Sequence, residues 1–333
     1  MIKIVSITLL IFVAKINSQV EISSMTPVNR DVFNAIIQFY QYDSKIPLDE
    51  EIVGQWKLDQ AVKYKIVFTG ANDSRVPGYL SIPKQDSTKH PCILLLHGVN
   101  GNKELWWEEE NYTRGELLIP QLTELGFAVV TLDAAYHGER IQDNGFVSPG
   151  AMVFRDGWPN RTREMYIRTV VDYRRLLDYL ATRPDIDISK IGTLGHSMGG
   201  MMTYLLTVVD SRIRASVSCV GPPMSETTYD LTAFSYSDKE KLAAISPFNF
   251  ASSIKSQAFL MLMGRNDAFH TIDEVEYLFE LISSPTKKLI WFDSGHVLPN
   301  EYVVDAVKWF KTHLNPTSPR NIKEWPKTDQ IRR

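Results

Sequence analysis

The sequence contains few cysteines, no large excess of either acidic or basic residues, and no long apolar run. It has 2 cysteines among 333 residues, which excludes a small scaffold held together by several disulfides. A chain of this length can instead bury a large core. There are 36 basic and 39 acidic residues, giving a formal net charge of −3, and this balance argues against nucleic acid as a partner. The chain also lacks a repeat at a fixed period and any long low-complexity tract.

Both cysteines, Cys92 and Cys219, lie in apolar segments that are typical of buried strands. We expect these two strands not to be neighbours, which places their Cα atoms beyond the reach of a disulfide. The sequence therefore predicts two buried free thiols, although secretion would permit a disulfide.

The N-terminus has the pattern of a secretory signal peptide over residues 1–18. A short basic start is followed by an apolar run from Ile4 to Ala14, with the small Ser18 near the expected cleavage position. The run is too short for a bilayer, which needs about 20 residues. The alternative is a buried N-terminal strand or helix. We expect a secreted or periplasmic protein without a membrane span; removal of residues 1–18 would make the net charge about −5.

The rest of the chain divides into three parts. Residues 19–61 are expected to form a partly helical lead-in, residues 62–314 a catalytic domain, and residues 315–333 a surface tail rich in Pro, Lys and Arg. Residues 64–69 and 79–83 resemble the two strands of an antiparallel hairpin.

After residue 91, apolar strand-like segments alternate with amphipathic helices. The expected strands lie at residues 92–96, 128–132, 191–194, 215–220, 258–263 and 288–292. Strands of this kind, apolar throughout and separated by helices, are typical of a parallel sheet covered on both faces. Sheets of this type place their active sites at the carboxyl ends of the strands.

The motif with the most chemical content is Gly195-His196-Ser197-Met198-Gly199, between an apolar strand and a helix-like segment. A G-x-S-x-G motif in this setting places its serine on a sharp turn at the sheet edge. The glycines permit strand and helix to approach closely there. Ser197 is therefore the candidate nucleophile; the alternative is an ordinary glycine-rich turn.

A serine hydroxyl needs a base, and the base needs an orienting acid. His296 follows the last expected strand through a short glycine-containing loop, so it is the candidate base. Asp267 follows the strand at 258–263 and is the candidate acid, with Asp293 as its rival. The order serine, acid, histidine is the one expected with this turn.

An acyl-transfer site also needs donors for the developing oxyanion. The backbone N–H of Met198, directly after the nucleophile, is one candidate. The loop His97-Gly98-Val99-Asn100-Gly101 follows an early strand, and the N–H of Val99 is the second candidate. The alternative is a glycine turn after a buried strand.

In this combination, His97-Gly98, Gly195 to Gly199, Asp267 and His296 resemble the α/β-hydrolase superfamily over residues 62–314. The segment Asp133 to Arg140 is similar to the loop of the dienelactone hydrolase, acetyl xylan esterase and prolyl oligopeptidase-like branch. The resemblance implies a mostly parallel eight-stranded sheet with helices on both faces and an N-terminal antiparallel hairpin. It also implies carboxylesterase-like activity without a metal or organic cofactor.

We therefore expect a secreted serine esterase that acts through an acyl-enzyme on a small-molecule or carbohydrate ester. Residues 221–250 are long enough for a small helical cap over the site. The open alternatives are a prolyl oligopeptidase-like peptidase, a lactonase or thioesterase, and a non-catalytic binding protein on the same fold. The oligomeric state is left open.

Overall fold

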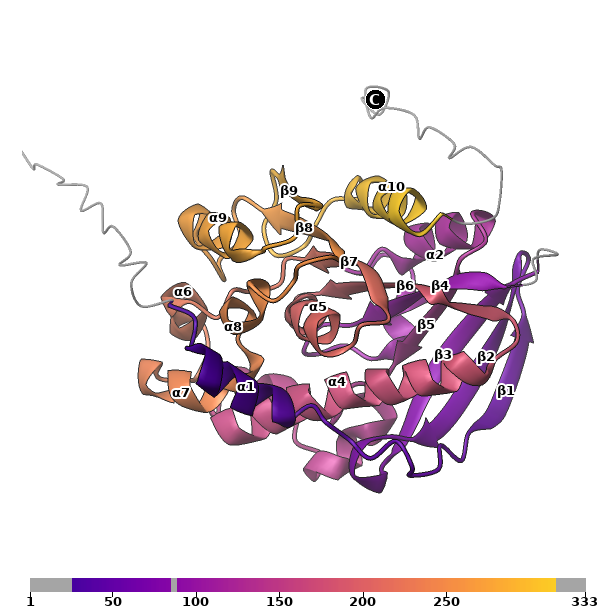
Figure 1. Ribbon diagram of the computed structural model, residues 1–333, viewed down its shortest axis with the longest axis horizontal. Coiled ribbons are helices and arrows are strands. Elements are labelled where there is room, and N and C mark those ends of the chain that lie inside the picture. Colours follow the sequence, from indigo (N-terminus) through magenta and orange to yellow (C-terminus); the bar gives the residue numbers. More distant parts are fainter. Residues whose placement is uncertain (1–25, 85–88, 316–333) are drawn as a thin grey trace, which may run out of the picture.

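The computed structural model of the protein describes residues 26–84 and 89–315. The predicted signal peptide and nearly all of the predicted tail lie outside these residues. The described chain folds around one nine-stranded sheet with the order β1-β2-β3-β5-β4-β6-β7-β8-β9 (Figure 1). The strands are β1 (Glu51–Lys57), β2 (Ala61–Thr69), β3 (Arg75–Pro83), β4 (His90–Leu96), β5 (Ala128–Leu132), β6 (Ile186–His196), β7 (Ile213–Cys219), β8 (Ala258–Gly264) and β9 (Lys287–Phe292).

The sheet has an antiparallel part and a parallel part. β1, β2 and β3 pair antiparallel, and β3 also pairs antiparallel with β5. From β5 through β4, β6, β7 and β8 to β9, every neighbouring pair is parallel. The predicted mostly parallel sheet and the predicted hairpin of β2 and β3 are confirmed.

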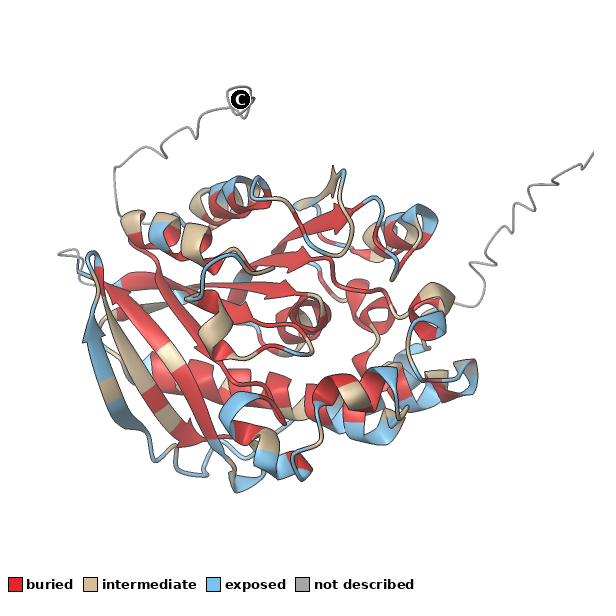
Figure 2. Cartoon of the chain, turned by 180° about the vertical axis from the view of Figure 1, so that it is seen from behind, coloured by how far each residue is buried: buried red, intermediate tan, exposed pale blue. Residues whose placement is uncertain are grey.

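The expectation of eight strands was wrong by one, because β1 forms within the predicted lead-in. Six of the seven residues of β1 are exposed, and the strand has an irregularity in its pairing between Ile52 and Gly54. A strand that is exposed on both faces shows no apolar alternation, so β1 could not be recognised from the sequence. Figure 2 shows this exposed outer strand beside the buried strands of the sheet centre.

Helices cover both faces of the sheet, as predicted. They are α1 (Arg30–Gln38), α2 (Gly115–Glu124), α3 (Pro149–Phe154), α4 (Pro159–Thr182), α5 (Met198–Val209), α6 (Glu226–Asp230), α7 (Lys239–Leu242), α8 (Pro247–Ala251), α9 (Ile272–Leu281) and α10 (Tyr302–Leu314). α4 and α5 lie on one face, and α2 and α10 lie on the other (Figure 1). Side chains that alternate along β4 enter the two cores in turn: Cys92 and Leu94 pack into the first, Ile93 and Leu95 into the second.

The two cysteines are both buried and free. Cys92 lies on β4 and Cys219 on β7, and β6 pairs with both strands and separates them. The predicted pair of buried thiols is confirmed.

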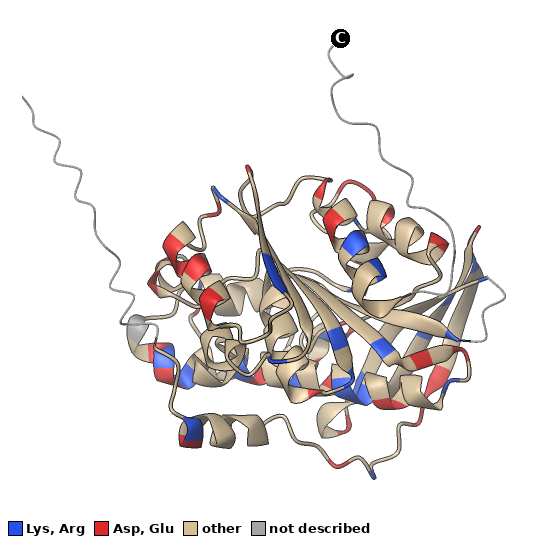
Figure 3. Ribbon diagram, turned by 45° about the horizontal axis from the view of Figure 1, so that its top comes forward, with Lys and Arg blue, Asp and Glu red and all other residues tan. Residues whose placement is uncertain are grey.

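The charged residues of the described chain are mixed in sign. Basic and acidic side chains occur on the same helices (Figure 3), as on α4, which carries Arg161, Glu164, Arg168 and Asp178. Among the described helices, none combines the length and the apolar content that crossing a bilayer requires.

Candidate active site

Ser197 occupies a sharp turn between β6 and α5. Its backbone has φ 58° and ψ −115°, a strained conformation for a residue with a side chain, and such strain costs about 1–3 kcal/mol. The turn is fixed by a hydrogen bond from the Ser197 N–H to the Cys219 carbonyl, 2.9 Å. A Cβ at Gly195 would clash with the Gly199 carbonyl oxygen, so the motif requires glycine where strand and helix meet.

The fold brings three of the predicted site residues into contact. His296 Nε2 lies 2.7 Å from Ser197 Oγ, and His296 Nδ1 lies 2.8 Å from Asp267 Oδ2. Asp293, the rival acid, instead accepts a hydrogen bond from the Asn266 side chain at 3.0 Å. Ser197, Asp267 and His296 follow β6, β8 and β9, so all three lie at the carboxyl edge of the parallel strands.

The acid of this group is buried and strongly biased toward its charged form. The Asp267 side chain has no exposure, whereas that of His296 is 28% exposed. Burial by itself would raise the pKa of Asp267, but its interactions with His270 and His296, with a hydrogen bond from the Phe269 N–H, lower that pKa well below the usual range. A carboxylate that stays ionised can hold the Nδ1–H of His296 and stabilise an imidazolium.

The loop after β4 brings Val99 to the same site. The Gly98 carbonyl, which belongs to the same peptide group, accepts hydrogen bonds from His97 Nδ1 at 2.8 Å and from the Gly101 N–H at 2.9 Å. In a trans peptide the N–H points away from the carbonyl, so the Val99 N–H is directed away from these partners. Val99 and Met198 both line the cavity beside Ser197, and Met198 is the first residue of α5, where backbone N–H groups lack helical partners.

A small apolar cavity of about 50 Å³ adjoins Ser197. Its walls come from α3, α4, α5, the segment 222–245 and the loops that hold Val99 and Phe269. The lining side chains include Val153, Tyr166, Met201, Met224, Phe234 and Phe269. The Phe269 ring packs on His296 with a centroid distance of 4.6 Å. The cavity can therefore take a short apolar group next to the serine.

Three buried histidines near the site had no role predicted from the sequence. His270 Nε2 lies 3.4 Å from Asp267 Oδ2; its position three residues after the acid was the only available signal. His137 lies in the segment after β5 and contacts the Val99 carbonyl. His196 is buried beside Tyr112.

Over residues 26–84 and 89–315, no group of three or more His, Cys, Asp or Glu side chains is arranged to hold a metal ion.

Comparison with known protein families identifies the family of this chain. A family model described as acetyl xylan esterase (AXE1) matches residues 9–233, more than half of the chain. The chain belongs to the acetyl xylan esterase family. A prolyl oligopeptidase family model also matches residues 158–317, which include Ser197, Asp267 and His296. These two matches confirm the prediction that this acetyl xylan esterase family member belongs to the acetyl xylan esterase and prolyl oligopeptidase-like branch of the α/β-hydrolases.

The curated relatives include an acetyl esterase and a cutinase. The chain is 24% identical over 261 residues to the acetyl esterase Axe7A of Xylanibacter ruminicola, covering 71% of this chain and 56% of that protein. It is 25% identical over 177 residues to the cutinase est1 of Thermobifida alba, covering 51% of this chain and 58% of that protein. The chain spans about half the length of the curated relatives it matches.

Solved structures support the fold. Acetyl xylan esterase 1 from Thermoanaerobacterium sp. JW/SL YS485 superposes with a TM-score of 0.68 at 21% identity, covering 88% of this chain and 96% of that chain. The acetyl xylan esterase from Paenibacillus sp. R4 gives a TM-score of 0.66 at 18% identity, covering 88% and 98%. At these identities the likeness shows the α/β-hydrolase fold.

Proposed function

We propose that this member of the acetyl xylan esterase family is a secreted serine hydrolase that cleaves carboxylic esters. The observation that carries the proposal is the position of His296, whose two ring nitrogens contact Ser197 Oγ at 2.7 Å and Asp267 Oδ2 at 2.8 Å beside a cavity. Esterase relatives and the family assignment support the same reaction class.

In the proposed reaction, Ser197 Oγ attacks the ester carbonyl while His296 Nε2 takes its proton. Asp267 holds the Nδ1–H and stabilises the imidazolium. The N–H groups of Val99 and Met198 donate to the tetrahedral oxyanion. Collapse breaks the ester C–O bond, and His296 returns the proton to the leaving alcohol. Water, deprotonated by His296, then attacks the acyl-enzyme. Collapse breaks the bond between Ser197 Oγ and the acyl carbon, His296 returns its proton to Ser197, and the acid is released.

The size of the cavity favours a short acyl group, because about 50 Å³ leaves little room beyond the first carbons. Relatives named for acetyl ester cleavage support an acetylated substrate, such as an acetylated carbohydrate. We infer that residues 221–250 act as a small cap, since Met224, Thr228 and Phe234 form part of the cavity wall. Secretion rests on the pattern of residues 1–18.

The test is a panel of activated and natural esters, acetylated sugars among them, assayed with the mature protein and with Ser197→Ala. We expect hydrolysis by the wild type and its loss in the variant. Equal turnover by both would contradict the assignment of Ser197, and no hydrolysis of any ester by the wild type would contradict esterase activity.

A peptidase is the second candidate, because the prolyl oligopeptidase family model also matches the part of the chain that holds the three residues. Comparing an aminoacyl amide with the corresponding ester separates the two activities. We expect the ester to be cleaved much faster; comparable cleavage of the amide would favour the peptidase.

A further inference from the structure

Two histidines join the oxyanion loop, residues 97–101, to the segment that follows β5, residues 133–140, here called the brace. His137, in the brace, places Nε2 2.7 Å from the Val99 carbonyl oxygen and Nδ1 2.8 Å from the Ala135 carbonyl oxygen. His97, in the oxyanion loop, accepts a hydrogen bond from the Ala134 N–H at Nε2, 3.1 Å. The two rings are 4.9 Å apart between centroids.

The His137 ring contacts two carbonyl oxygens, but a neutral imidazole has only one N–H to donate. It is 2% exposed, and this burial lowers the pKa of the ring to about 3. At neutral pH the ring is therefore uncharged and carries one N–H. A bond to Ala135 would stay within the brace, whereas a bond to Val99 crosses to the oxyanion loop.

We propose that His137 is a positioning residue for the oxyanion hole, whose Nε2–H donates to the Val99 carbonyl and holds the Val99 N–H against the reacting ester. The inference rests on the proposed function. Val99 is then fixed on both sides: its own carbonyl by His137, and the carbonyl of the preceding peptide by His97 and Gly101.

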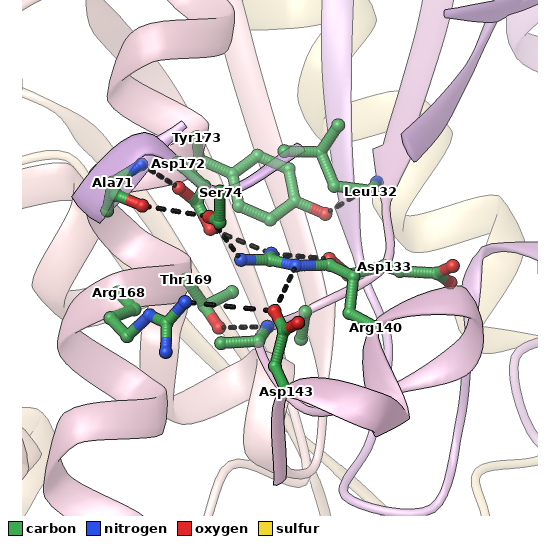
Figure 4. A network of polar contacts seen from close by, with 12 residues as sticks. Ala71, Ser74, Leu132, Asp133, Arg140, Asp143, Arg168, Thr169, Asp172 and Tyr173 are labelled. Atoms are coloured by element: carbon green, nitrogen blue, oxygen red, sulfur yellow. Dashed lines mark hydrogen bonds and ion pairs between the residues drawn. The ribbon is translucent and has the colours of Figure 1, made fainter. Parts of the chain in front are cut away.

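The brace can hold another loop because it is itself anchored. Arg140 donates to the Asp133 carbonyl at 3.1 Å and to Asp172 of α4 at 2.8 Å, and the Ala135 N–H donates to Thr169 of the same helix at 2.9 Å. Figure 4 shows the contacts of Arg140 with Asp133, Asp172 and Ser74. On the other side, the Lys103 backbone and ammonium groups both donate to Asp133, each at 2.9 Å.

Loss of the His137 contact should act on the transition state more than on substrate binding. The Val99 N–H matters most when negative charge develops on the carbonyl oxygen, so its displacement lowers kcat and leaves KM nearly unchanged. A misplacement of about 1 Å can cost about 10²-fold in rate.

The experiment compares three variants. In His137→Gln the side-chain amide nitrogen can replace Nε2, in His137→Asn it can replace only Nδ1, and His137→Leu has no donor. The measurements are kcat and KM on one short-acyl ester, with kcat normalised to active sites titrated by a serine-directed phosphonate. Thermal unfolding of each variant identifies a purely structural loss, which would lower the midpoint without lowering kcat per active site.

We expect His137→Gln to retain kcat within a few-fold, and His137→Asn and His137→Leu to lose about 10- to 100-fold with KM little changed. A wild-type kcat in His137→Asn, or an equal loss in His137→Gln, would overturn the proposal. Wild type and Ser197→Ala in the same assay keep the two proposals apart. If the wild type is inactive, the proposed function fails. If it is active and Ser197→Ala is not, a normal His137→Asn refutes the positioning role alone.

Discussion

Two groups of polar side chains lie near the oxyanion loop, and they differ in whether one end of the group opens to a cavity. In the first, Ser197, His296 and Asp267 form a chain that ends at a cavity. In the second, Lys103, Asp133, Arg140 and Asp172 are fully buried and bond to one another and to backbone carbonyls and N–H groups. We therefore propose that these residue types serve the reaction in the first group, which opens to a cavity, and hold loops in place in the second group, which bonds to buried backbone.

The comparison predicts the largest effect on activity at the open end. Ser197→Ala removes the nucleophile and should lower kcat/KM on the order of 10⁶-fold, with little change in the midpoint of thermal unfolding. Ser294→Ala, in the loop before His296, is the matched control and should stay close to wild type. A Ser197→Ala enzyme that keeps substantial activity would show that another group attacks.

The next largest effect is expected at the acid. Asp267→Asn should lower kcat about 10⁴-fold, because the amide holds His296 in the wrong tautomer. Asp293→Asn is the control, since Asp293 contacts Asn266 and is the acid nearer to His296 in sequence. If Asp293→Asn is the more damaging change, Asp267 is not the orienting acid.

Substitution in the second, buried group should lower the stability of the fold more than the activity. Asp172→Asn removes the carboxylate 2.8 Å from the buried Arg140 and leaves it only the more distant Asp143, at 3.9 Å. This change should lower the free energy of unfolding by about 3–5 kcal/mol. The fall in kcat per active site should be smaller than for Asp267→Asn. Urea unfolding measures the first quantity. The control is Asp156→Asn, which loses only the ion pair with the exposed Arg155 and is expected to match wild type. An Asp172→Asn protein with the unfolding free energy of wild type and a kcat as low as that of Asp267→Asn would contradict the proposed difference between the two groups.

A more modest effect concerns the cavity at the open end. Acetyl and propionyl esters should be preferred over octanoyl esters by about 10-fold or more in kcat/KM. Met224→Ala shortens a side chain of the cavity wall and so enlarges the cavity. This change should shift the ratio toward the longer acyl chain. Competition between paired esters measures the ratio directly. An unchanged preference would place the acyl group elsewhere.

The smallest effect is a dependence of stability on pH. The folded protein lowers the pKa of Asp267, so its carboxylate contributes stability at pH values above the ordinary carboxyl pKa of about 3.9. That contribution is lost as the pH falls through the lower pKa of the folded state. The difference in unfolding free energy between wild type and Asp267→Asn should therefore shrink on acidification, and a constant difference would contradict the shift.

Much of the fold could be predicted because its strands are apolar throughout and alternate with helices. The candidate residues Ser197, Asp267 and His296 could be found because each follows a predicted strand, and parallel strands bring their carboxyl ends to one edge. β1 could not be predicted, because an exposed, irregular edge strand leaves no apolar period. The contacts of His270 and His137 depend on the packing of loops after different strands, which spacing in the sequence does not determine.

The central claim is that Ser197 is the activated nucleophile of a serine hydrolase. The most direct test treats the folded protein with a serine-directed phosphonate and locates the adduct by peptide mass spectrometry. The account predicts one adduct per chain, on Ser197, which does not form when the protein is unfolded before treatment and forms much more slowly in Asp267→Asn. No adduct on the folded protein, or an adduct on another serine, would contradict it.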